Sequence, residues 1–136
     1  MYSQAEAHLT ILDHCPSRSL RRAYLVLLQA SERAGLRCEA REQARGLVMR
    51  NDAGLQFVTV ELAGDALLLS LCRPALAQNP GLASDAVERF PGRVRGAPGS
   101  SDIAIRLGSE MDAEDVVDWL FPAGNFSLGY EARKSA

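Results

Sequence analysis

The stretch Leu55-Gln-Phe-Val-Thr-Val-Glu-Leu-Ala-Gly-Asp-Ala-Leu-Leu-Leu-Ser-Leu-Cys-Arg73 predicts the centre of the fold. It is the most apolar stretch of the chain, and a Gly-Asp pair at residues 64 and 65 interrupts it where a hairpin has to turn. From Val58 to Glu61 valine alternates with a polar residue, which is typical of a strand in a sheet that is covered on one side. Residues 67–71 are apolar on both faces, so we expect this second strand in a central position.

Further strand patterns flank this hairpin. Residues 45–50 have strand character and lead into the turn sequence Asn51-Asp-Ala-Gly54, which predicts a three-stranded antiparallel meander with the hairpin. Residues 103–107 alternate as a further strand, and a brief strand is expected around Val94. Residues 36–45 are charged and weakly patterned, and we assign no element to them. The sequence therefore predicts an α+β fold, with an antiparallel sheet of four to five strands and helices packed mainly on one face.

Four segments have the three- and four-residue apolar spacing of helices. The longest is expected to begin at an N-cap, Ser17, and to stop at Gly35, and its wide apolar stripe favours a helix that lies across the sheet with a neighbour on its flank. We expect the last helix to begin at Asp112, with Asp115 in a capping arrangement. The remaining helices are expected at 4–13 and 83–90, the stretch 74–80 is read as a connection, and 125–130 as a further turn of helix.

Length and composition define a general class of protein. A chain of 136 residues predicts one domain, 1–136, with a flexible tail at 130–136. Its first residues have neither the basic nor the apolar region of an export signal, and no run approaches the length of a membrane span. Three widely spaced cysteines, Cys15, Cys38 and Cys72, are typical of reduced thiols rather than of a disulfide framework. We therefore expect a cytoplasmic protein that does not enter a membrane.

The second half of the chain resembles a family of bacterial domains. The residues that carry the resemblance are Phe57-Val-Thr-Val60, Leu67-Leu-Leu-Ser-Leu71, Asp102-Ile-Ala-Ile-Arg-Leu-Gly-Ser109 and Met111-Asp-Ala-Glu-Asp-Val-Val-Asp-Trp-Leu120. The family is an uncharacterised group of small domains, often attached to predicted transport or nuclease-like proteins. Because it has no established activity, the resemblance implies an α+β fold and no particular site residue.

Few residues of the chain have the spacing that catalysis or metal binding requires. The two histidines, His8 and His14, lie near the start, and no Cys-x-x-Cys or His-x3-His spacing occurs, so we expect no metal and no cofactor. Asp13-His14-Cys15 places a thiol beside an imidazole, but neighbouring side chains in a turn diverge. Acidic residues cluster from Glu110 to Asp118, where helix capping and solvation explain them. A Gly-x-Ser-x-Gly elbow is absent from the sequence, so we lean against an enzyme.

Arginines carry the two candidate binding sites. Arg18, Arg21 and Arg22 occupy the opening turn of the long helix, where a cation opposes the helix dipole and a bound anion would relieve the conflict. Arg93 and Arg95 lie in a segment rich in glycine and small residues, which could expose backbone N–H groups to an anion. The alternatives are solvated side chains at the first site and a plain surface connection at the second.

The expected function follows from these sites. We expect a non-catalytic binding or accessory module for an anionic ligand, a nucleic acid or a protein partner. A sequence pI near 5.7 argues against strong non-specific binding to nucleic acid. An alternative is a homo-oligomeric interaction protein without a ligand, in contact through a sheet edge or through Trp119 and Phe121. A carboxylate-dependent enzyme is a further alternative.

Overall fold

The computed structural model describes residues 4–41, 45–51, 53–78, 81–95 and 103–121. Within these residues the chain forms five helices: α1 (Gln4–His14), α2 (Arg18–Arg33), α3 (Arg73–Gln78), α4 (Leu82–Arg89) and α5 (Glu110–Leu120). It also forms six strands: β1 (Arg37–Arg41), β2 (Gly46–Arg50), β3 (Gln56–Ala63), β4 (Ala66–Leu71), β5 (Val94–Arg95) and β6 (Ile103–Leu107). The strands make one antiparallel sheet in the order β1-β2-β3-β4-β6-β5, which confirms the α+β class.

The hairpin of β3 and β4 lies in the middle of this sheet, as expected. Val58 pairs with Leu71 and Val60 with Leu69, and the turn at Gly64 has a positive φ of 64° that favours glycine. Strand β4 then pairs with β6 on its other side, so its apolar residues are enclosed between neighbouring strands. The hydrophobic pattern of this stretch therefore set its place in the sheet.

The sheet has six strands, one more than the upper limit of the prediction. The additional strand is β1, in the charged segment to which the sequence analysis assigned no element. Its apolar side consists of only Cys38 and Ala40, which pair with Met49 and Leu47 of β2. Two small side chains give too weak an alternation to identify a strand, and β1 forms because β2 offers a partner.

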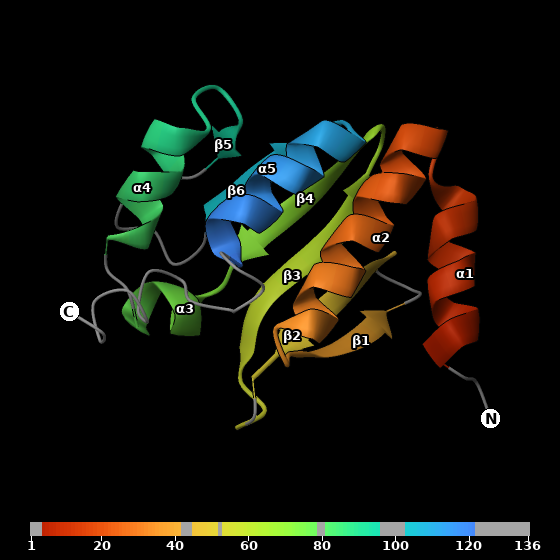
Figure 1. Cartoon of the computed structure of the whole chain (residues 1–136), viewed down its shortest axis with the longest axis horizontal. Helices are drawn as coiled ribbons and strands as arrows, with labels where there is room; N and C mark the ends of the chain where they lie inside the picture. Colours follow the sequence, from red (N-terminus) through yellow and green to blue (C-terminus); the bar gives the residue numbers. More distant parts are fainter. Residues whose placement is uncertain (1–3, 42–44, 52, 79–80, 96–102, 122–136) are drawn as a thin grey trace.

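The helices cover one face of the sheet (Figure 1). Helices α2 and α5 contact each other and lie over the sheet, roughly aligned with β3 and β4 in this view, with α1 on the far flank of α2 and α4 beside α5. Between them and the sheet is the core, whose largest fully buried side chains are Tyr24, Ile11, Leu20, Leu27, Leu47, Met49, Leu67, Leu69, Leu71, Ile103, Ile105 and Leu107. The prediction that helices pack mainly on one face is confirmed, as is a neighbour on the flank of the long helix.

Two helix predictions need correction. Helix α5 begins at Glu110, not at Asp112, because the Ser109 hydroxyl accepts a hydrogen bond from the backbone N–H of Asp112 at 3.2 Å and forms the N-cap. The segment read as a connection at 74–80 contains α3. The Ser17 cap of α2 is confirmed, since its hydroxyl accepts from the N–H of Leu20 at 3.1 Å. The segments predicted at 125–130 and 130–136 lie outside the described residues.

Candidate functional site

The uncovered face of the sheet carries the polar strand residues. Strand register groups on it the side chains of Arg37, Glu39, Arg41, Val48, Arg50, Thr59, Glu61, Leu68, Ser70, Arg95, Ala104 and Arg106, which we call the open face. Side chains alternate between the two sides of a strand, so their immediate neighbours point into the core below the helices. Most members of the open face keep part of their surface in solvent. Five of them are arginines, and two are glutamates.

Three arginines and one glutamate of the open face line a single depression. Glu39 of β1 accepts from Arg41 Nε at 2.7 Å and lies 3.9 Å from Arg50 Nε. Arg37 pairs with Arg50 across the β1–β2 ladder, so its side chain is on the same face. Together with Cys38 these residues line a depression of about 480 Å³. We call Arg37, Arg41 and Arg50 the arginine cluster; with Glu39 it has an excess of two positive charges.

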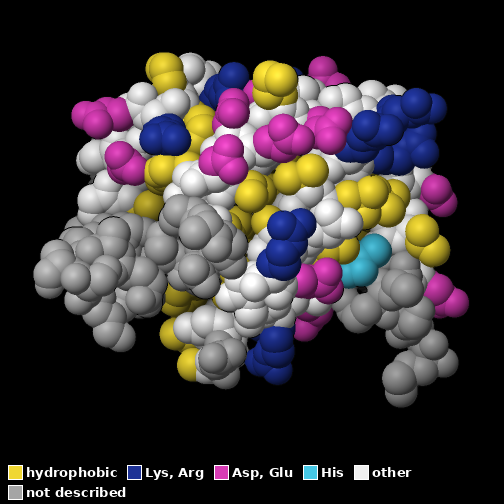
Figure 2. Space-filling view, viewed as in Figure 1, with side chains coloured by type: hydrophobic (Ala, Val, Ile, Leu, Met, Phe, Trp, Pro, Cys, Tyr) yellow, Lys and Arg dark blue, Asp and Glu magenta, His cyan; other side chains and the backbone are white. Residues whose placement is uncertain are grey.

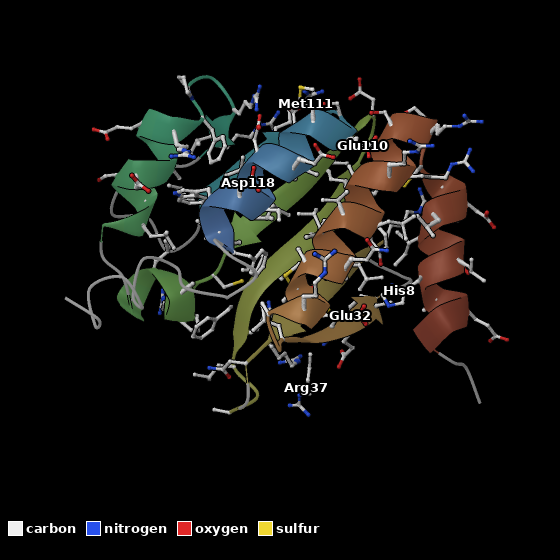
Figure 3. The ribbon with its side chains drawn as sticks, in the orientation of Figure 1. His8, Glu32, Arg37, Glu110, Met111 and Asp118 are labelled. Atoms are coloured by element: carbon white, nitrogen blue, oxygen red, sulfur yellow. The ribbon has the colours of Figure 1, made fainter. Side chains whose placement is uncertain are left out.

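The cluster is held by local backbone structure as well as by ion pairing. Arg50 Nη1 donates to the Gly54 carbonyl at 3.2 Å, which ties the end of β2 to the turn before β3. In that turn the Asn51 side-chain oxygen accepts from the N–H of Leu55 at 2.9 Å. Arg37 projects from the start of β1, below the end of α2 in the view of Figure 3. Arg50 is therefore partly fixed, while Arg37 and Arg41 reach into solvent.

A second depression adjoins the first and shares Arg41 with it. It measures about 320 Å³ and is lined by Arg41, Gly46, Leu47, Val48, Gln56, Thr59, Val60 and Glu61. Gly46 pairs with Arg41 on one side and with Glu61 on the other, so no side chain fills the space between these two charges. A Cβ atom at Gly46 would collide with the carbonyl oxygen of Val60, and the position accepts only glycine. Arg41 lines both depressions, which together span β1, β2 and β3.

Four of the five arginines chosen from the sequence lie elsewhere. Arg18, Arg21 and Arg22 are exposed at the start of α2, where basic side chains gather in Figure 2. Arg22 Nη1 lies 3.9 Å from Glu110 Oε1, and the neighbouring helix starts are linked because Ser19 Oγ accepts from the N–H of Glu110 at 2.9 Å. Glu110 of α5 thus supplies a counter-charge to one of the three arginines, Arg22.

The second predicted pair divides between the two sides of the sheet. Arg93 Nη1 contacts Asp112 Oδ1 at 2.9 Å, so this guanidinium is already paired with an acid at the start of α5. Arg95 pairs with Ala104 in the β5–β6 ladder and belongs to the open face. Arg22 and Arg93 therefore meet the start of α5 from different elements, whereas Arg95 lies on the same sheet face as the arginine cluster.

Sequence reasoning missed the arginine cluster because two of its members are in β1. The period-two pattern Arg37-x-Glu39-x-Arg41 was the signal that places three charges on one strand face. Their approach to Arg50 depends on the pairing of β1 with β2, which local spacing does not encode.

A separate group of titratable side chains joins α1 to α2. The phenol oxygen of Tyr24, a residue with 0 % exposure, lies 2.6 Å from His8 Nδ1, and His8 points from α1 toward α2 (Figure 3). Burial lowers the pKa of His8, and the nearby Glu32 carboxylate acts in the opposite direction. Burial also raises the pKa of Tyr24 and of the Cys38 thiol, which lies 2.8 Å from Ser31 Oγ. These groups stay neutral at pH 7 and serve packing.

The thiol and imidazole of the Asp13-His14-Cys15 trio each contact a backbone carbonyl of α1. In the Asp13-His14-Cys15 trio, His14 Nδ1 donates to the Thr10 carbonyl at 2.8 Å, and the Cys15 thiol contacts the Ile11 carbonyl at 3.6 Å. Burial raises the pKa of Cys15, so the thiol and the imidazole do not form a nucleophile and base.

The aromatic residues considered for dimer contact are occupied within the chain. Trp119 Nε1 donates to Asp85 Oδ2 at 2.6 Å, and its ring meets Phe90 edge-on at a centroid distance of 5.3 Å. Phe121 is only 3 % exposed. Both aromatic side chains therefore stabilise the packing around α5.

No family model, curated protein or solved structure matches this chain. In the part of the chain that the structure describes, no three His, Cys, Asp or Glu side chains are grouped so as to hold a metal ion. No helix within the same residues combines the length and apolar character needed to cross a membrane. The open face, with its arginine cluster, is the candidate site.

Proposed function

We propose that this protein is a non-catalytic binding module that recognises an anionic group of a partner on the open face of its sheet. The observation that supports the proposal is the arginine cluster: Arg41 and Arg50 share the carboxylate of Glu39, and Arg37 lines the same depression of about 480 Å³. One carboxylate carries too little negative charge to neutralise three guanidinium groups. It also has too few acceptor oxygens to bind all of their N–H donors. The surplus charge and donors suit a carboxylate or a phosphate, which guanidinium groups bind in a bidentate manner.

The position of the cluster also favours binding over a purely structural role. The β1–β3 part of the open face carries no described helix over the cluster, whereas β1 is covered on its opposite face by α1 and α2. Exposed ion pairs contribute little to stability, about 0.2–1 kcal/mol each, so the cluster is not needed to hold the sheet together. Arg95 adds a further cation to this face, which retains one of the arginines expected from the sequence.

Titration of isotope-labelled protein by two-dimensional amide NMR tests the proposal. The probes are inorganic phosphate and hexaglutamate, added at low salt to wild type, to an Arg37→Gln/Arg41→Gln double variant and to an Arg18→Gln/Arg21→Gln control. We expect shifts at residues 37–41 and 46–50 in wild type and in the control. The double variant should bind more weakly by about 1–2 kcal/mol, or about 5- to 30-fold, because two cation contacts are lost. Shifts confined to the start of α2, or equal binding by all three proteins, would refute the open face as the site.

A further inference from the structure

We propose that the partner is a protein segment of mixed charge, whose acidic side chain enters the arginine cluster while a nearby basic side chain meets Glu61. This inference rests on the proposed function and specifies the ligand of the same face. It derives from the second depression, whose opposite sides carry charges of opposite sign, Arg41 and Glu61.

The geometry separates these two charges and leaves the space between them open. Arg41, Gly46 and Glu61 are successive partners across β1, β2 and β3, so Arg41 and Glu61 start about 9–10 Å apart, or two strand spacings. Arg41 is directed to Glu39 at 2.7 Å. Glu61 is exposed and makes no ion pair with any described residue. An unpaired carboxylate thus lies beside an arginine cluster without neutralising it.

Glu61 distinguishes between classes of anionic partner. A nucleic acid presents phosphates at every step, so a strand that crosses the cluster would bring a like charge against Glu61. A peptide can alternate its charges, and its side chains at positions i and i+2 project to the same side about 6.8 Å apart when it is extended. The reach of a lysine or arginine side chain covers the remaining separation. A segment with the pattern acid-x-base therefore fits the Arg41 to Glu61 spacing.

The floor of the second depression suits a peptide backbone. Val48 is only 7 % exposed and supplies an apolar surface, while Thr59 and Gln56 contribute a hydroxyl and an amide. Side chains of this type can donate to and accept from peptide groups that lie over them. Gly46 keeps the centre free of side-chain atoms, so a backbone can approach the sheet closely.

Fluorescence anisotropy with four labelled twelve-residue probes tests this inference. They are repeats of Glu-Ser-Lys-Ser, the all-acidic Glu-Ser-Glu-Ser, the all-basic Lys-Ser-Lys-Ser, and an oligothymidylate of equal length. Binding is measured for wild type, for Glu61→Gln, and for Glu114→Gln, which removes an exposed acid of α5 as a matched control. We expect wild type and Glu114→Gln to prefer the mixed peptide over the all-acidic one by about fivefold. Glu61→Gln should lose that preference, since it no longer attracts the base or repels the second acid.

The outcomes distinguish this inference from the function on which it rests. If the all-acidic peptide binds as tightly as the mixed one and Glu61→Gln changes nothing, the partner is not of mixed charge, although the open face still binds anions. If the oligothymidylate binds more tightly than the mixed peptide, the inference is overturned in favour of a nucleic acid. If no probe binds to wild type, and phosphate and hexaglutamate also leave the amides of 37–50 unchanged, both proposals fail.

Discussion

The contact between Tyr24 and His8 holds α1 against α2, and its removal has a predictable effect on stability. Tyr24 is 0 % exposed, and its hydroxyl lies 2.6 Å from His8 Nδ1. Because burial lowers the pKa of His8, the imidazole is neutral at pH 7.5, and its unprotonated Nδ1 accepts a hydrogen bond from the Tyr24 hydroxyl. A Tyr24→Phe substitution keeps the ring in the core and removes only the hydroxyl.

The expected loss is that of one partly buried hydrogen bond. Such a bond contributes about 1 kcal/mol to the free energy of unfolding. The phenylalanine ring has no polar atom, so position 24 itself contributes no unsatisfied donor or acceptor to the core. For a chain of this length, 1 kcal/mol corresponds to about 4 °C in Tm. Urea denaturation and thermal melting at pH 7.5 measure the two quantities. A Tyr24→Phe variant as stable as wild type would show that the 2.6 Å contact contributes nothing.

The same contact predicts a pH dependence whose sign follows from linkage. The pKa of His8 in the folded protein lies below its ordinary value of 6.5, so the unfolded chain binds the proton first as pH falls. Stability attributable to His8 is therefore fully present above pH 6.5 and is lost as pH falls from there toward the lowered pKa. Glu32 opposes the shift, and its carboxylate limits the size of the effect.

A comparison of variants isolates this effect from other titrating groups. The difference in the free energy of unfolding between wild type and His8→Gln should shrink as pH is lowered from 7.5 to 5.5, because His8→Gln no longer titrates there. His14→Gln, from the exposed side of the same helix, is the matched control for loss of an imidazole. If the difference grows on acidification, the folded pKa of His8 is raised and the assignment of Nδ1 as acceptor is wrong.

Three further predictions concern single positions. Gly46→Ala should lower the free energy of unfolding by about 3 kcal/mol in urea titrations, since its Cβ would collide with the Val60 carbonyl. Gly35→Ala is the control, with positive φ but open space, and should cost about 1 kcal/mol; equal losses would contradict the close approach at Gly46. Ser109→Ala should lose about 1 kcal/mol through the missing N-cap of α5, and an unchanged Tm would argue against that cap. Cys15 should be alkylated by iodoacetamide only as fast as the protein unfolds, because burial both covers it and raises its pKa; faster labelling detected by mass spectrometry would show that the thiol is reactive in the folded state.

Much of the fold was accessible from local sequence patterns. The alternation from Val58 to Glu61 identified which side of β3 faces the helices, because successive side chains of a strand point to opposite faces. The Gly-Asp turn and the Ser17 cap were recognisable for similar reasons, since each depends on the backbone preference of one or two residues. The start of α5 was predicted two residues too late. The acids of its first turn, Glu110 and Asp112, also fit a helix that begins at Asp112, whereas the N-cap is Ser109.

The candidate site was far less accessible. The arginines at the start of α2 were plausible from the helix dipole alone, but Arg22 meets Glu110 of a helix that lies 88 positions later in the sequence. No local rule places Glu110 beside Arg22. Of the arginines considered from the sequence, only Arg95 lies on the face that carries the candidate site.

By itself, the sequence determined the α+β class, the central hairpin and the polar and apolar sides of its strands. Residue spacing encodes these features directly, because helices and strands repeat at fixed intervals. Only the tertiary structure decided that β1 joins the sheet, that Arg37 and Arg41 approach Arg50, and that Gly46 separates Arg41 from Glu61. Each of these depends on the register between strands, which follows from pairing energies summed over the sheet and cannot be read from the spacing within one strand.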